Sequence, residues 1–179
     1  MKKIILTLFL LTIQLSVHSQ SLEEISFQIK NEINQIIQEN KKEEKIIPDR
    51  HYTIKITSYG PNLVAYNKIY QNYYNFTNTY LVKNDIIFYS HEKGQMSFVF
   101  SGEVSKDVNY AYGDLFEIEY YFIDKNKGYK FEKRVTLFSN DIVAEKQKEL
   151  DSLAYTITEI GNSDYNSIYK YYSVYVRAK

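Results

Sequence analysis

Glu117 and Glu119 are the residues whose types and spacing come closest to a catalytic pattern. On a strand, their carboxylates would share one face about 6 to 7 Å apart, which overlaps the separation used in glycoside hydrolysis. Glycosidases carry the acid and the nucleophile on separate elements lining a cleft, whereas glutamates alternating with apolar residues are typical of a solvent-facing strand. We therefore expect these two carboxylates to pair across a hairpin with Lys130 or Arg134.

Ligands for a metal ion are scarce, because His51 and His91 are the histidines that follow the N-terminal leader and the sequence has no cysteine. The pair His91-Glu92 lacks the second histidine, four residues later, that a metalloprotease helix requires, so a surface polar pair is the favoured interpretation. A Gly-x-Ser-x-Gly elbow and a glycine-rich phosphate loop are both missing from the sequence. The sequence therefore predicts no catalytic residue, metal site or cofactor.

Tyrosine is the residue type with the clearest functional meaning, since the chain has 19 Tyr and 10 Phe but no Trp. Aromatic residues favour pleated, half-buried surfaces, so this composition first indicates β-sheet. Alternation places Tyr73 and Tyr121 away from the expected core, where their rings could stack on sugars or anchor a protein partner. The favoured interpretation is that a second layer, such as a C-terminal helix, covers them, since aromatic-rich sheets are normally buried on at least one face.

Charge excludes two classes of partner. The 22 basic residues balance the 22 acidic ones, and removal of Lys2 and Lys3 with a signal peptide leaves 20 against 22, a difference of minus two. A nucleic-acid binder or a protein that binds an anionic membrane surface would carry a basic patch. We therefore expect neither partner.

The N-terminus has the pattern of a secretory signal peptide. Lys2 and Lys3 precede an apolar segment over residues 4–15, which is shorter than the ~20 residues of a membrane-spanning helix. Small residues near position 19 place the cleavage between Ser19 and Gln20. Residues 1–19 are thus predicted to be a signal peptide and residues 20–179 a single exported, soluble domain without a stable membrane anchor, a cysteine-linked lipid or a disulfide.

A helix is predicted directly after the leader. Its apolar residues recur at steps of three and four, at Leu22, Ile25, Ile29, Ile33, Ile36 and Ile37. Ser21 and Glu24 have the spacing of a capping box. The mixed-charge run over residues 41–45 is interpreted as a solvated helix end or linker that Pro48 closes.

From residue 52 to residue 138 the apolar period is two, which predicts strands. The predicted strands are residues 52–56, 74–82, 96–100, 116–122 and 129–137, with a turn at Gly60-Pro61-Asn62 and a polar hairpin loop at residues 124–128. Residues 81–87 resemble residues 137–143 in the order strand, Asn-Asp, strand. We interpret this repeat as two hairpins of one antiparallel sheet, because Asn and Asp tolerate the left-handed backbone of tight turns.

The C-terminal third has two competing patterns. The repeat predicts a returning strand after Ile142, whereas the apolar spacing from Lys146 to Ile160 is helical with Gly161 as a C-terminal cap. We expect a short strand followed by that helix. The tail from Ser163 has helical spacing, although residues 171–176 would also suit a strand, and helix is slightly favoured.

The hairpin segments at residues 79–85 and 136–141 resemble those of small uncharacterised exported proteins of Bacteroidetes. The order of signal peptide, short helix and aromatic hairpins is similar over residues 1 to 145. This resemblance implies a location in a Gram-negative cell envelope. It brings no activity and no functional residue.

Together these patterns predict an α+β fold in which an N-terminal helix packs on a curved antiparallel sheet of about six or seven strands, followed by C-terminal helical segments. The predicted function is a non-enzymatic binding or interaction module of the cell envelope, with an envelope protein or a glycan as partner. One alternative is a small-molecule carrier with a cavity under the sheet. The other is a hydrolase without a recognisable motif, which would bring Glu117, Glu119 or His91 together with distant residues in a concave pocket.

Overall fold

A computed structural model describes residues 21–48, 52–70, 74–97 and 109–173 of the chain. The predicted signal peptide, its cleavage between Ser19 and Gln20, and Tyr73 lie outside the described residues. By its internal contacts the chain forms two compact units, Met1–Gln35 and Ile36–Lys179. None of the helices within the described ranges is long and apolar enough to cross a membrane.

The first described element is the helix α2, which spans Leu22–Glu39. It begins with the predicted capping box: the Ser21 amide donates to Glu24 Oε2 at 3.1 Å, and the Glu24 amide donates to Ser21 Oγ at 3.2 Å. These two bonds satisfy backbone donors that the first turn of a helix leaves unpaired. At the other end, the Asn40 side chain donates to the carbonyl of Ile36 at 2.9 Å.

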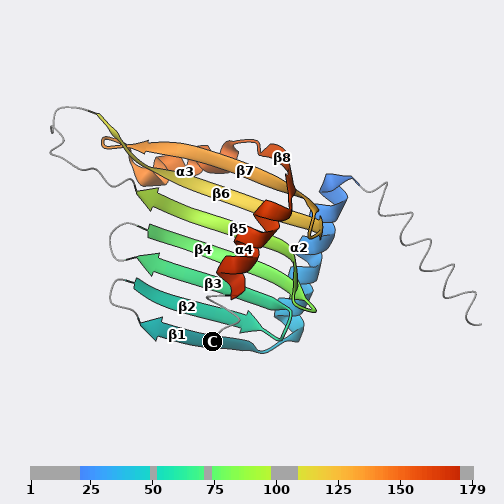
Figure 1. Cartoon of the computed structure of the whole chain (residues 1–179). Coiled ribbons are helices and arrows are strands. Elements are labelled where there is room, and N and C mark those ends of the chain that lie inside the picture. Colours follow the sequence, from blue (N-terminus) through green and yellow to red (C-terminus); the bar gives the residue numbers. More distant parts are fainter. Residues whose placement is uncertain (1–20, 49–51, 71–73, 98–108, 174–179) are drawn as a thin grey trace, which may run out of the picture. The chain divides into compact units, whose positions relative to one another are not determined.

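The second unit contains one open antiparallel sheet of eight strands, each paired with its neighbours in sequence (Figure 1). The strands are β1 Lys42–Pro48, β2 Tyr52–Tyr59, β3 Leu63–Tyr70, β4 Tyr74–Lys83, β5 Ile86–Ser97, β6 Ala111–Asp124, β7 Lys127–Phe138 and β8 Thr156–Gly161. The helices α3 (Val143–Ser152) and α4 (Asn162–Tyr172) flank β8 in sequence. The predicted combination of antiparallel sheet and helices is confirmed, but the expected six or seven strands is too few.

The first additional strand is β1, which replaces the predicted linker at residues 41–45. It pairs with β2 in antiparallel orientation, so that Glu43 lies opposite Ser58 and Lys45 lies opposite Ile56. Charged side chains and a terminal proline are common on edge strands, because they discourage pairing with another chain. A mixed-charge run is therefore as suitable for a sheet edge as for a linker.

The second Asn-Asp segment does not form a hairpin, so the interpretation of the repeat is wrong for that copy. In the first copy, Asn84 and Asp85 have φ of 50° and 61°, which the tight turn between β4 and β5 requires. Of the described non-glycine residues, only these two have positive φ. Asp141 instead accepts a hydrogen bond from the Phe138 amide at 2.7 Å, and the chain continues into α3.

The predicted helix over residues 146–160 is correct only as far as Ser152, where α3 ends. Residues from Thr156 onward form β8, in which Thr156 pairs with Glu132 and Gly161 with Lys127 of β7. Strand pairing overrides the helical spacing here, because the β-branched residues at positions 156–158 favour a strand once a partner edge is available. Gly161 precedes α4 and does not cap a preceding helix.

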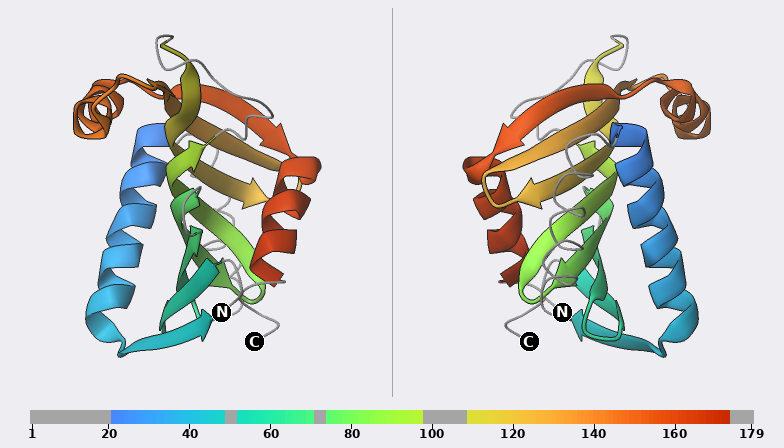
Figure 2. Two further views of the ribbon diagram at one scale, coloured as in Figure 1. Left: turned by 90° about the vertical axis from the view of Figure 1, so that its left-hand side faces the viewer. Right: turned by 90° about the vertical axis from the view of Figure 1, so that its right-hand side faces the viewer.

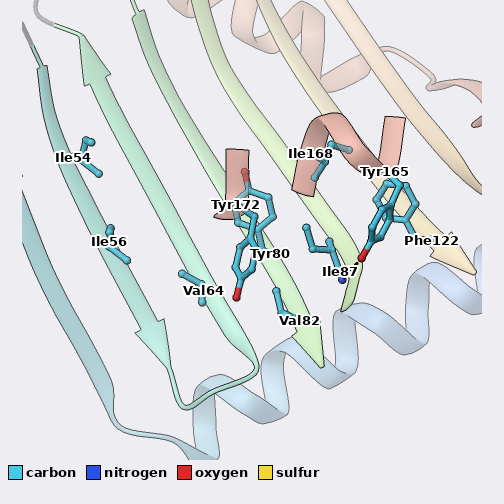
Figure 3. Packing of buried hydrophobic residues seen from close by; sticks show 10 residues of the cluster. All are labelled: Ile54, Ile56, Val64, Tyr80, Val82, Ile87, Phe122, Tyr165, Ile168 and Tyr172. Carbon is cyan, nitrogen blue, oxygen red and sulfur yellow. Dashed lines mark hydrogen bonds between the residues drawn. The ribbon is translucent and has the colours of Figure 1, made fainter. Parts of the chain in front are cut away.

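The helical tail is confirmed by α4, which lies against one face of the sheet (Figure 2). We call this face the α4 face. Tyr165, Ile168 and Tyr172 of the helix pack there on buried residues from the five strands β2 to β6 (Figure 3). The sheet residues of this cluster are Ile54, Ile56, Val64, Tyr80, Val82, Ile87 and Phe122. On the opposite face, Leu150 of α3 packs on Leu115, Val135 and Leu137.

The backbones of β5 and β6 approach each other closely at Gly113, which predicts that alanine destabilises the fold more at this glycine than at Gly161. A Cβ added at Gly113 would clash with the backbone oxygen of Met96 and lie 3.1 Å from the Cα of Ser97, whereas at Gly161 the nearest atom is 3.6 Å away. We expect Gly113→Ala to lower the free energy of unfolding by about 1–3 kcal/mol, because backbone atoms cannot yield as a flexible side chain can. Urea denaturation measures this, with Gly161→Ala as the control. Equal effects of the two substitutions would contradict the register between β5 and β6.

Candidate functional site

Tyr121 is buried, as the interpretation of a covered face predicted, and it is therefore not an exposed recognition residue. Its side chain is 4% exposed, and its ring centroid lies 5.1 Å from those of both Tyr89 and Phe131. Its hydroxyl donates a hydrogen bond to Glu119. The reason is that β6 is buried on both faces over this stretch, so alternation along the strand does not separate core from solvent.

Glu117 and Glu119 share a strand face as predicted, but they are not solvent-facing and do not pair with Lys130 or Arg134. Those two basic side chains stand on the opposite face of β7, where each forms an ion pair with Glu132. The register places Glu117 directly opposite Lys93 of β5 and Lys133 of β7 instead.

We call the group formed by His91, Lys93, Glu117, Glu119 and Lys133 the charged cluster. Glu117 is its centre: its Oε1 lies 3.0 Å from His91 Nε2, while its Oε2 lies 3.0 Å from Lys133 Nζ and 3.8 Å from Lys93 Nζ. Three strands supply these residues, so distant parts of the sequence meet as the enzymatic alternative required.

Glu119 is the most enclosed member of the charged cluster, with 5% of its surface exposed. Its Oε2 accepts a hydrogen bond from Tyr121, and its Oε1 accepts one from the hydroxyl of Tyr155 at 3.2 Å. The Tyr155 ring also lies beneath Lys133, whose Nζ is 4.9 Å from the ring centroid. Both carboxylate oxygens are thus occupied by the protein's own donors.

The protonation equilibria follow from this environment. Burial by itself raises the pKa of Glu117, but the hydrogen bond from Lys133, the charge of Lys93 and the contact with His91 together hold that pKa below its usual value. Burial and the neighbouring charges of Glu119 and Glu117 raise the pKa of the Tyr155 hydroxyl. The carboxylate therefore stays ionised and the phenol stays protonated at neutral pH.

A divalent metal ion is a poor fit to the charged cluster, although its donor types are suitable. One ligand atom each from His91, Glu117 and Glu119 lies within 4.8 Å of the others. Lys133 and Lys93 already provide the positive charge that a metal would supply, and a metal would be repelled by both. The same enclosure disfavours glycoside hydrolysis, because Glu119 has no free oxygen to offer a substrate.

A groove on the α4 face is a different kind of candidate. It has a volume of about 340 Å³ and lies between the edge strand β1, the turn after β2 and the end of α4. Its lining residues are Glu43, Glu44, Lys45, Ile56, Ser58, Gly60, Pro61, Val64 and Tyr172. We call it the β1–α4 groove.

Local sequence explains how the groove is built. The β1–β2 register brings Glu43 beside Ser58 and Lys45 beside Ile56, so charged side chains of the edge strand border an apolar strand residue. Gly60 has φ of +63° and makes the turn that places Pro61 at the rim. Sequence reasoning missed this site, because no local pattern shows that Tyr172 closes it from a helix more than a hundred residues away.

Comparison with protein-family models, with curated proteins and with solved structures found no match. The candidate sites therefore rest on the geometry of this chain alone.

The lowered pKa of Glu117 makes a prediction about acid stability. A carboxylate with a depressed pKa stabilises the fold above its unfolded value, near 4.5, and this stabilisation is lost as the pH falls through the lower folded value. At pH 7 we expect Glu117→Gln to lower the free energy of unfolding by about 1–3 kcal/mol, since it leaves Lys133 without its charged partner. Below pH 4.5 the difference from wild type should shrink.

Chemical denaturation at a series of pH values measures both effects. The matched control is Glu149→Gln, since Glu149 is exposed on α3 and should change stability by less than about 0.5 kcal/mol. A difference between Glu117→Gln and wild type that stays constant from pH 7 to acid would show that the charge of Glu117 does not stabilise the cluster.

Proposed function

We propose that this protein is an exported, non-enzymatic binding module of the cell envelope, and that its β1–α4 groove takes a small neutral ligand rich in hydroxyl groups, such as a mono- or disaccharide. The observation that carries this proposal is the mixture of apolar and polar residues around one concave site. Export rests on the predicted signal peptide, and the envelope location on the resemblance described above.

The lining of the groove suits a sugar. Ile56, Val64 and Tyr172 provide apolar surface against which the C–H faces of a sugar ring can pack. Glu43 and Lys45 lie at the rim and provide an acceptor and a donor for hydroxyl groups. Because the rim carries both signs of charge, neither an anionic nor a cationic ligand is favoured overall.

The volume of the groove narrows the choice of ligand further. A volume of about 340 Å³ is at the small end of the range for ligand pockets. It suits one or two sugar rings better than a long acyl chain. A carrier with an enclosed cavity under the sheet is less well supported, because the side chains of Tyr80, Ile87 and Phe122 fill the space beneath α4 (Figure 3).

The enzymatic alternative has less support than binding. The charged cluster brings together Glu117, Glu119 and His91, as a hydrolase would need, but lysines and tyrosines of the protein occupy both carboxylates. Such a closed network is typical of a structural ion-pair group. The open groove is therefore the better candidate for ligand contact.

Titration calorimetry with glucose, maltose, cellobiose and N-acetylglucosamine tests the proposal. We expect saturable binding of at least one sugar by the wild type, and a loss of affinity of about tenfold in Lys45→Ala and Glu43→Ala. Both residues are exposed on an edge strand, so these variants should fold. The matched controls are Lys148→Ala and Glu145→Ala on α3, which should bind as the wild type does.

Two results would overturn the proposed function. One is that none of the four sugars binds saturably. The other is that a sugar binds equally well to Lys45→Ala, Glu43→Ala and the two controls, since the ligand would then lie elsewhere.

The proposed export of the protein can be tested separately. We expect N-terminal sequencing of the protein purified from an envelope fraction to begin at Gln20. Recovery of the chain from the cytoplasm with residues 1–19 attached would contradict export while leaving the groove proposal intact.

A further inference from the structure

A group of polar side chains lies among the buried residues of the α4 face. It consists of Asn78 and Tyr80 on β4, Ser90 and Glu92 on β5, and Tyr120 on β6. The register pairs Asn78 with Glu92 and Tyr80 with Ser90, and it places Ser90 opposite Tyr120. All five side chains therefore share one face, and we call them the polar island.

Two atoms of the polar island are buried without a hydrogen-bond partner among the described residues. They are Asn78 Oδ1 and Ser90 Oγ, in side chains that are 4% and 0% exposed. The Asn78 amide nitrogen donates to the Tyr80 hydroxyl at 3.3 Å and to the Glu92 carboxylate, so these bonds use the nitrogen of the amide and leave its oxygen for another donor. Buried polar atoms are nearly always paired, so these two mark a place that another group completes.

Glu92 adds a third acceptor. Its side chain is half-buried, so the island can be reached from the surface at this residue. Burial raises the pKa of Glu92, and the hydrogen bond from Asn78 opposes that rise. Among the described residues no lysine, arginine or histidine forms an ion pair with Glu92, in contrast to Glu117 and Glu132.

We propose that the polar island is a binding site for a primary ammonium group, held by Asn78 Oδ1, Ser90 Oγ and the Glu92 carboxylate. An ammonium group has three N–H donors and no acceptor, which matches three acceptors on one face. The aromatic side chains of Tyr80 and Tyr120 border these acceptors. Aromatic rings attract a cation, and the attraction is stronger when the cation is desolvated. The positive charge would also supply the counter-ion that Glu92 lacks.

The ammonium group could belong to a free amine or to a lysine side chain of a partner protein, and the shared chemistry is what the island recognises. The acceptors of this site and the lining of the β1–α4 groove have no residue in common, although the ring centroids of Tyr80 in the island and Tyr172 in the groove lie 5.5 Å apart. Failure of sugar binding and failure of amine binding are therefore separate results.

The experiment uses nuclear magnetic resonance with n-butylamine, its neutral counterpart n-butanol, and Nα-acetyl-lysine amide as a mimic of a protein side chain. We expect both amines, but not butanol, to shift the side-chain amide signals of Asn78 saturably. In Glu92→Gln the affinity for the amines should fall about tenfold or more. The control Glu159→Gln, an exposed carboxylate on β8, should bind as the wild type does.

Tighter binding of acetyl-lysine amide than of butylamine would assign the site to a protein partner, and the reverse order to a free amine. Ser90→Ala is the second variant, since it removes one acceptor without changing charge; it should fold and bind amines more weakly. The proposal is overturned if butanol shifts the signals as butylamine does, if Glu92→Gln keeps full affinity, or if no amine shifts them. In the last case ordered water would complete the two buried atoms.

Discussion

The packing of α4 on the sheet is the interaction on which the proposed binding face of this protein depends. Tyr165 and Ile168 fill the space above Ile87 and Phe122, and the Ile87 amide donates to the Tyr165 hydroxyl at 3.3 Å across 78 residues of sequence. The helix is held at a defined place along the strands because that bond joins its first turn to the β4–β5 hairpin. Tyr172, two turns later, can therefore reach the groove.

The two faces of the sheet are stabilised by different interactions. On the α4 face, aromatic and branched side chains exclude water beneath α4, while polar side chains form the polar island, border the groove and, on β7, form the ion pairs of Glu132 with Lys130 and Arg134. On the opposite face, the charged cluster neutralises itself with Lys93 and Lys133 on either side of Glu117. A slip of one residue in either strand pairing would place these lysines on the apolar face, so the cluster specifies the register of β5, β6 and β7.

Local sequence patterns correctly predicted the elements that are determined by residues close together in the sequence. The capping box of α2, the β6–β7 hairpin, the turn at Asn84-Asp85 and the helical tail all follow from spacing and turn chemistry. The incorrect predictions concern segments whose secondary structure depends on tertiary pairing. The stretch at residues 156–160 becomes a strand because the edge of β7 is available, and residues 42–48 become a strand because β2 is.

The candidate sites were harder to predict for the same reason. Alternation correctly placed Glu117 and Glu119 on one face, but their partners depend on which strand lies beside β6, and β5 is separated from it in sequence. Alternation alone left open whether Tyr121 was exposed or covered, and its neighbours Tyr89 and Phe131 bury it. The groove needs β1 and α4 together, from opposite ends of the described chain, and no local pattern carries that information.

We propose that ligand recognition takes place on the α4 face and not at the charged cluster. Mapping of backbone amide chemical shifts, during titration with the sugar that binds most tightly, tests this most directly. We expect the largest shifts at Ser58, Gly60, Val64 and Tyr172. Largest shifts at His91, Glu117 and Tyr155 would contradict it and would make the charged cluster the functional site.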